Sequence, residues 1–166
     1  MAQIFFQEIP VNTYGELPAV GTKAPGFTLV GGDLKEITLD QFTGKRVVLN
    51  IFPSIDTGVC AASVRRFNKD ANEMPNTVVL CVSEDLPFAA ARFCAAEGLN
   101  NVIPASAFRS PKFAEDYGVM MVDGPLKGLL ARAVVVINEK GDVIYRQLVE
   151  QITDEPDYKA ALEVLK

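Results

Sequence analysis

The sequence predicts an α/β fold in which helices cover both faces of a mixed central sheet. An apolar run at 47–52 is followed by a turn and a helical pattern, which indicates a buried strand leading into a helix. A second run at 78–82 is also followed by a helical pattern, so we expect the two strands to be parallel. Two strand patterns at 133–137 and 143–148 flank turn residues and predict an antiparallel hairpin.

The remaining segments complete this fold. Gly and Pro clusters predict the loops, and Pro or acidic residues before an apolar spacing predict the helix starts. The first half is expected to hold an N-terminal hairpin around 4–11, a loop at 17–25, strands at 27–30 and 35–39, a helical turn at 40–42, a strand at 46–52 and a helix at 58–71. The second half is expected to hold a strand at 77–82, a helix ending at Gly98, a strand at 102–104, a helix at 111–117, a loop at 120–128, the hairpin, and a helix capped by 154–156. This order is thioredoxin-like, with the hairpin as an N-terminal extension.

The composition is that of one globular domain spanning residues 1–166. The formal charge is −5, and there is no basic cluster beyond Arg65-Arg66, which argues against nucleic acid and anionic membranes as partners. No apolar run approaches the roughly 20 residues that a membrane span needs. Met1–Pro10 lacks the basic start and apolar core of a signal peptide, so we expect a cytoplasmic protein.

Histidine is absent, which removes imidazole-based catalysis and histidine metal ligands. The cysteines Cys60, Cys81 and Cys94 form no Cys-x-x-Cys pair, so the sequence offers neither a zinc site nor a thioredoxin-type motif. Cys81 lies within the apolar run at 78–82, where a packed and inert thiol is expected. Cys94 lies near a helix end, and its residue type leaves packing and function equally open.

Cys60 has the most informative position of the three. It follows the turn 53–57 after a buried strand and lies where a helix is expected to begin. The start of a helix carries unpaired N–H groups and about half a positive charge, so a thiol there ionises more easily and becomes a nucleophile. Pro53 can fix the turn and shield the sulfur, while the Thr57 hydroxyl can face the sulfur or simply cap the helix.

A thiolate in a chain without histidine needs another cation nearby, and arginine is always charged. The candidates are Arg65, Arg66, Arg92 and Arg132. Arg132 stands just before the apolar strand at 133–137, where a cation usually has an anion to meet.

Two stretches resemble a known family. The pattern Pro53-x-x-x-Thr57-x-x-Cys60 resembles the active-site signature of the peroxiredoxins. The wider stretches 50–61 and 123–129 are similar to the bacterial thiol peroxidase branch, whose members are atypical two-cysteine peroxiredoxins. The similarity runs from about residue 21 to residue 165 and is weakest in the first fifteen or so residues.

The resemblance implies a role for each of five residues. Cys60 matches the peroxidatic cysteine, and Cys94 matches the resolving cysteine that joins it in an intrachain disulfide. Thr57 and Pro53 match the hydroxyl and the proline of the signature, and Arg132 matches the arginine that pairs with the thiolate and the peroxide. The implied reaction is reduction of hydrogen peroxide and alkyl hydroperoxides without metal, flavin or haem. A thioredoxin-like reductant and a homodimer are implied as well.

A disulfide requires Cα atoms within roughly 7 Å, and Cys60 and Cys94 are expected at the ends of two separate helices. We therefore expect both helices to unwind locally on oxidation.

Three alternatives compete with the peroxidase: a thiol–disulfide oxidoreductase, a non-enzymatic redox switch using the same cysteine pair, and a structural protein with three core cysteines. The missing Cys-x-x-Cys motif disfavours the first, and the third leaves Thr57 and Arg132 unexplained.

Overall fold

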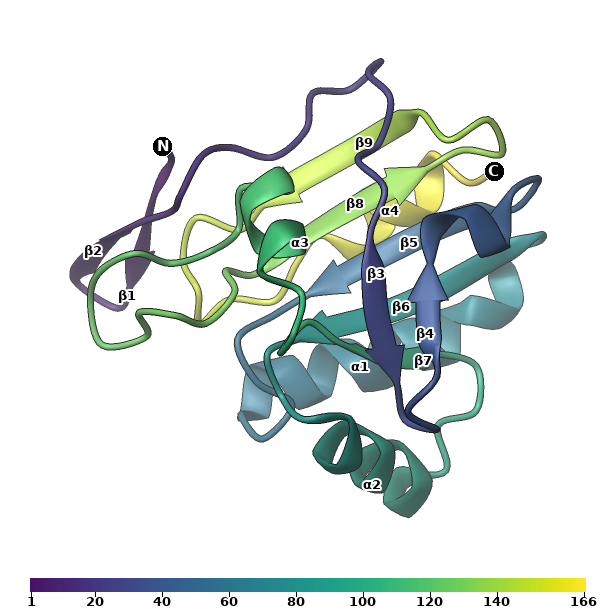
Figure 1. The fold of residues 1–166 in the computed structure, drawn as a ribbon, viewed down its shortest axis with the longest axis horizontal. Helices are drawn as coiled ribbons and strands as arrows, with labels where there is room; N and C mark the ends of the chain where they lie inside the picture. The colour runs from purple at the N-terminus through teal and green to yellow at the C-terminus, as the bar shows by residue number, and fades with distance from the viewer.

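The computed structural model describes residues 1–166 and contains a seven-stranded mixed sheet with a separate two-stranded hairpin (Figure 1). The strands are β1 (Gln3–Phe6), β2 (Ile9–Asn12), β3 (Thr28–Gly31), β4 (Glu36–Thr38), β5 (Arg46–Ile51), β6 (Thr77–Ser83), β7 (Ile103–Ser106), β8 (Ala133–Ile137) and β9 (Val143–Leu148). The α-helices are α1 (Gly58–Asp70), α2 (Pro87–Glu97), α3 (Pro111–Asp116) and α4 (Tyr158–Glu163), and the 3₁₀ turns are η1 (Leu39–Phe42) and η2 (Ala71–Glu73).

The large sheet has the strand order β4-β3-β7-β6-β5-β8-β9. The central strand β5 runs parallel to β6 on one side, with Asn50 opposite Cys81, and antiparallel to β8 on the other, with Ile51 opposite Ala133. The predicted parallel pair and the predicted β8–β9 hairpin are both confirmed. The register of β8 matters for the site, because it brings the residue before Ala133 beside the residues that follow Ile51.

Two apolar layers cover the two faces of this sheet. One layer packs α3 and the segment before β3 against the sheet, with Phe27, Phe113 and Tyr117 as its aromatic members. The other packs α1 and α4 against the opposite face through Phe67 and Tyr158, whose rings meet edge to face. Figure 1 shows α3 on the near side of the sheet, and α1 and α4 on the far side. The predicted thioredoxin-like α/β fold is thereby confirmed.

The N-terminal hairpin pairs β1 with β2 and packs into a small apolar cluster of its own. Ile4 and Val11 lie there with Met121, Ala131 and Ile152. The Ile152 N–H also donates to the Phe5 carbonyl at 2.8 Å, which fixes the segment after β9. The hairpin therefore packs against Ala131, which precedes Arg132, and against Ile152, whose carbonyl Arg132 contacts. Both residues are remote from the hairpin in sequence.

Several expected element boundaries differ from the structure, and two of these differences have a clear physical reason. The last helix is capped by Asp157 rather than by residues 154–156, because the Asp157 carboxylate accepts the Ala160 N–H at 3.0 Å. The strand expected at 102–104 is β7, which covers Ile103–Ser106 because it pairs along β6 as far as Ser83. The longest helix has 13 residues, and none of the helices combines the length and the apolar character that crossing a bilayer requires.

Gly118, two residues after the end of α3, has a φ of +64°, and a Cβ there would overlap backbone atoms of Glu16. We expect Gly118→Ala to lower the free energy of unfolding by about 3 kcal/mol or more, since left-handed strain and the clash add. The control is Gly44→Ala, where φ is +87° but no atom lies within 4 Å, and about 1 kcal/mol is expected. Denaturant unfolding measures the free energy of unfolding of both variants. Equal losses in the two variants would contradict the prediction that the overlap with Glu16 adds to the cost of Gly118→Ala.

Candidate active site

Cys60 lies in the first turn of α1, as the third residue of the helix. The preceding strand β5 ends at Ile51, and the segment 52–57 turns the chain into the helix. Cys60 is fully buried, and it shares an apolar cluster with Val64 and Phe67 of the same helix. The sequence-predicted placement of this thiol at a helix start is therefore observed.

Arg132 is the cation that the structure brings to Cys60. Its Nη2 donates to the Cys60 Sγ over 3.3 Å, and its Nε donates to the Ile152 carbonyl over 2.8 Å. Arg132 is only 2% exposed, so little water competes for its charge. A hydrogen bond from an ionised donor is about twice as strong as a neutral one, so this contact fixes the guanidinium against the sulfur.

The position of Arg132 follows from the sheet. Arg132 precedes Ala133, and Ala133 pairs with Ile51 across the β5–β8 ladder. The three other candidate arginines do not contact the sulfur. Arg65 pairs with Glu97, Arg66 pairs with Asp70, and Arg92 is exposed on α2.

Arg132 also carries a buried nitrogen, Nη1, with no hydrogen-bond partner. Leaving a buried donor unpaired costs free energy, and such atoms are uncommon in folded proteins. This donor belongs to the same guanidinium that contacts Cys60. It is therefore available to donate a hydrogen bond to a polar ligand beside the sulfur.

Thr57 occupies the N-cap position of α1, but its side chain does not cap the helix. Its hydroxyl donates to the Ser54 carbonyl over 3.0 Å, and the residue is exposed. No hydrogen bond joins this hydroxyl to Cys60. Pro53 is buried at the start of the turn, directly after the last residues of the central strand.

Asp85 is a residue that the sequence does not single out and that the structure connects to the site. Its carboxylate accepts three hydrogen bonds: from the Ser54 hydroxyl at 2.8 Å, from the Ile55 N–H at 2.7 Å and from the Ser83 hydroxyl at 2.6 Å. The first two donors belong to the turn that leads to Cys60. The Ser83-x-Asp85 spacing after an apolar strand was the available signal, because such residues often fold back onto nearby chain.

Cys94 lies in the last turn of α2, which ends at Gly98 with a φ of +67°. It is 8% exposed, and burial raises the pKa of its thiol, so the neutral form is favoured in the closed helix. Cys60 and Cys94 belong to the same apolar cluster, and both are free thiols in this structure. Intact α1 and α2 therefore accompany the reduced cysteines.

Cys81 is buried within the central strand β6. Burial raises its pKa to about 12, although a weak hydrogen bond from the Asn50 amide at 3.8 Å opposes this. No cation contacts it. The interpretation of Cys81 as an inert core residue agrees with this environment.

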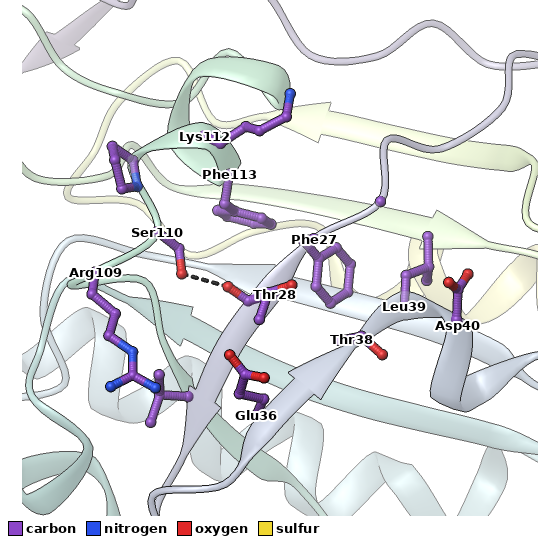
Figure 2. A pocket seen from close by; sticks show the side chains of 13 residues that line it. Phe27, Thr28, Glu36, Thr38, Leu39, Asp40, Arg109, Ser110, Lys112 and Phe113 are labelled. Carbon is purple, nitrogen blue, oxygen red and sulfur yellow. Dashed lines mark hydrogen bonds between the residues drawn. The ribbon is translucent and has the colours of Figure 1, made fainter.

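One surface groove borders the turn before Cys60, and a larger hollow lies elsewhere in the molecule. A groove of about 290 Å³ separates the turn residues 54–56 from α2, where Ala89, Phe93 and Ala96 line it. A larger hollow of about 560 Å³ lies between β3, β4 and α3. Figure 2 shows side chains that line it, among them Phe27, Glu36 and Arg109. It contains no cysteine, so the chemistry predicted from the sequence does not take place there.

A scan against family models matches the Redoxin family over residues 19–162. The chain belongs to the Redoxin family. The match covers every strand of the large sheet as well as Cys60, Cys94 and Arg132.

Individual relatives agree with this assignment. A thiol peroxidase of Mycobacterium tuberculosis is 61% identical over 165 residues, covering 99% of each chain. A peroxiredoxin-like protein from Aquifex aeolicus, 38% identical, has a TM-score of 0.93 and covers 98% of this chain and 95% of its own. A thiol peroxidase from Chromobacterium violaceum, 22% identical, shares the fold with a TM-score of 0.91, covering 98% of this chain and 94% of its own. The predictions of an enzyme and of a thiol peroxidase relationship are confirmed.

The environment of Cys81 predicts its reactivity. With a pKa of about 12, the folded protein holds only about one thiolate in ten thousand at pH 8 at this position, so alkylation should be very slow. Iodoacetamide treatment followed by peptide mass mapping measures the order in which the cysteines react. We expect Cys81 to react last in the folded protein and as fast as the others in 6 M guanidinium. Early modification of Cys81 in the folded state would contradict the assignment.

Proposed function

We propose that the chain is a thiol-dependent peroxidase that reduces hydrogen peroxide and alkyl hydroperoxides, with Cys60 as the nucleophile. One observation carries the proposal: a thiol at a helix start receives a hydrogen bond at 3.3 Å from a buried arginine in a chain without histidine. The confirmed relationship to thiol peroxidases supports the same reaction.

In the first step the Cys60 thiolate attacks the terminal oxygen of R–O–O–H. An S–O bond forms while the O–O bond breaks, which leaves Cys60 as a sulfenic acid and releases an alkoxide or hydroxide. The released oxygen takes a proton from solvent and leaves as alcohol or water. Positive charge beside the breaking bond lowers the barrier, because negative charge develops on the departing oxygen.

Thr57 and Arg132 are suited to hold the two peroxide oxygens. The Thr57 hydroxyl already donates its proton to the Ser54 carbonyl, so its lone pairs are free to accept from the O–H of the peroxide. The free Nη1 of Arg132 can donate to the other oxygen. Because Thr57 is exposed and Cys60 is not, we place the approach of the peroxide on the Thr57 side, with Pro53 shielding the sulfur from water.

In the second step the Cys94 thiol attacks the sulfenic sulfur, so that a disulfide forms and water leaves. Both helices are intact around reduced cysteines, and a disulfide needs Cα atoms within roughly 7 Å. We propose that the first turn of α1 and the last turn of α2 open for this step. Opening also exposes Cys94, which removes the burial that keeps its thiol neutral.

The reaction closes when a dithiol reductant exchanges with the Cys60–Cys94 disulfide and restores both thiols. A thioredoxin-like protein, a cytoplasmic location and a homodimer are part of this proposal, and they rest on the resemblance described above. Sedimentation analysis of the purified protein measures its mass in solution and so tests the homodimer.

The alternative function is a non-enzymatic switch that uses the same cysteines. Turnover distinguishes the two, since a switch consumes one equivalent of peroxide and stops.

Arg132→Gln is expected to slow the oxidation of Cys60 by hydrogen peroxide about 30- to 100-fold, because one charge-assisted hydrogen bond in a buried site is lost. The measurement is the rate of Cys60 oxidation under single-turnover conditions. The control is Arg65→Gln, which also removes one positive charge. Arg65 lies on α1 and pairs with Glu97 at the surface, away from the sulfur, so this variant should keep the parental rate. A rate unchanged by Arg132→Gln would remove Arg132 from the mechanism.

Cysteine variants assign the chemical roles. After one equivalent of peroxide, mass spectrometry of the parent should show a Cys60–Cys94 bridge, whereas Cys94→Ser should stop at oxidised Cys60. Cys60→Ser should consume no peroxide, and Cys81→Ser should keep parental turnover with a thiol reductant. Undiminished activity in Cys60→Ser would refute the proposed function.

A further inference from the structure

We propose that Asp85 is a positioning residue that holds the turn before Cys60 in its peroxide-reactive form and that opposes the later opening toward Cys94. This proposal rests on the peroxidase function above and adds to it a residue that controls the balance between the two chemical steps. Asp85 does not contact the Cys60 sulfur, so its effect passes through the turn.

The first step of the argument is the direct contact. Asp85 accepts the Ser54 hydroxyl at one carboxylate oxygen, and the Ile55 N–H and the Ser83 hydroxyl at the other. Three donors on one carboxylate fix its orientation, and hydrogen bonds to an ionised group are about twice as strong as neutral ones. The turn is thereby tied to the end of strand β6.

From Ser54 the hydrogen bonds continue to the helix. The Ser54 hydroxyl accepts the Asp56 N–H at 3.2 Å, and the Ser54 carbonyl accepts both the N–H and the hydroxyl of Thr57, at 3.3 and 3.0 Å. The Thr57 carbonyl in turn accepts the Ala61 N–H at 2.9 Å, within the first turn of α1. Asp85 is therefore two hydrogen bonds away from the Thr57 hydroxyl that we place on the peroxide.

Asp85 also lies next to the helix that carries Cys94. It stands two residues before Pro87, the first residue of α2, and its own carbonyl accepts the Ser106 hydroxyl at 2.6 Å. The same residue thus anchors the turn before Cys60 and the entrance to α2. A movement that brings the two helices together must strain or break this anchor.

Apolar packing and the Asp85 contacts hold the turn in different ways. Ile55 of the turn is buried in the apolar cluster that also contains Cys94 of α2. A groove of about 290 Å³ nevertheless lies between the turn residues 54–56 and α2, and Asp85 is part of its lining. Apolar contacts are not directional, so the hydrogen bonds of Asp85 are the contacts that fix the orientation of the turn backbone beside this groove.

The consequence is an opposite effect on the two steps. Hydrogen bonds that exist only in the closed form lower its free energy, which favours the arranged Thr57 hydroxyl and raises the cost of local opening. Weakening the anchor should slow the attack of Cys60 on peroxide and should speed disulfide formation with Cys94. A residue that only stabilises the fold would not separate the steps in this way.

The test is Asp85→Asn, which keeps the shape but removes the charge. Rapid quenching with a thiol reagent and mass spectrometry follow both steps, since the chain has no tryptophan to report them. In a Cys94→Ser background we expect oxidation of Cys60 by hydrogen peroxide to slow about tenfold, as one charge-assisted contact weakens. With Cys94 present we expect conversion of sulfenic acid to disulfide to accelerate severalfold.

The matched control is Asp70→Asn. Asp70 is a carboxylate at the other end of α1, 7% exposed and paired with Arg66, and it does not touch the turn. We expect both rates to stay at the parental values. Ser54→Ala is the second variant, because it removes one link of the same chain and keeps the Asp85 charge. It should shift both rates in the same directions as Asp85→Asn, by a smaller factor, and it decides the matter if Asp85→Asn does not fold.

The proposal is overturned if both steps slow together, if oxidation of Cys60 is unchanged, or if Asp70→Asn produces the same split. Failure of the proposed function has a different signature. In that case the Cys94→Ser protein with Asp85 intact would already show no oxidation of Cys60.

Discussion

The contact between the Arg132 guanidinium and the Cys60 sulfur is the interaction on which the proposed chemistry depends. Burying a cation is costly unless partners compensate it, and Arg132 is 2% exposed. The Ile152 carbonyl and the sulfur occupy two of its nitrogens, while Nη1 has no partner. In a chain without histidine, this guanidinium supplies the fixed positive charge at the sulfur, and it retains a donor for a second ligand.

Much of the scaffold holds the two ends of this contact. The pairing of Ile51 with Ala133 brings the end of β5 beside the start of β8, so the turn before Cys60 and the residue before Ala133 meet at one edge of the sheet. The N-terminal hairpin fixes Ile152, which orients the guanidinium. On the other side of the site, Asp85 fixes the turn through Ser54 and Ile55. Segments far apart in sequence therefore converge on a single sulfur.

The three cysteines illustrate how environment divides one residue type into separate roles. Cys60 is buried but meets a cation at a helix start. Cys94 is buried at a helix end, where burial raises the pKa of its thiol, and in the proposed mechanism that helix opens before Cys94 reacts. Cys81 lies in a central strand, where burial raises the pKa of its thiol to about 12. Local opening of the fold is therefore part of the proposed reaction as much as the thiol chemistry is.

The sequence by itself determined the local elements and the position of the cysteine that we propose as the nucleophile. Apolar runs, the turn at 53–57 and the helix ends at Gly98 and Gly118 depend on interactions between near neighbours, and these placed Cys60 at a helix start and Cys81 in the core. The pairing of β5 with β8, the choice of Arg132 among the four candidate arginines and the hydrogen bonds from Ser54 and Ile55 to Asp85 were decided only by the tertiary structure. These contacts join residues 30 to 90 positions apart in the chain, and no local pattern of hydrophobicity or turn residues records which distant segment a side chain will meet.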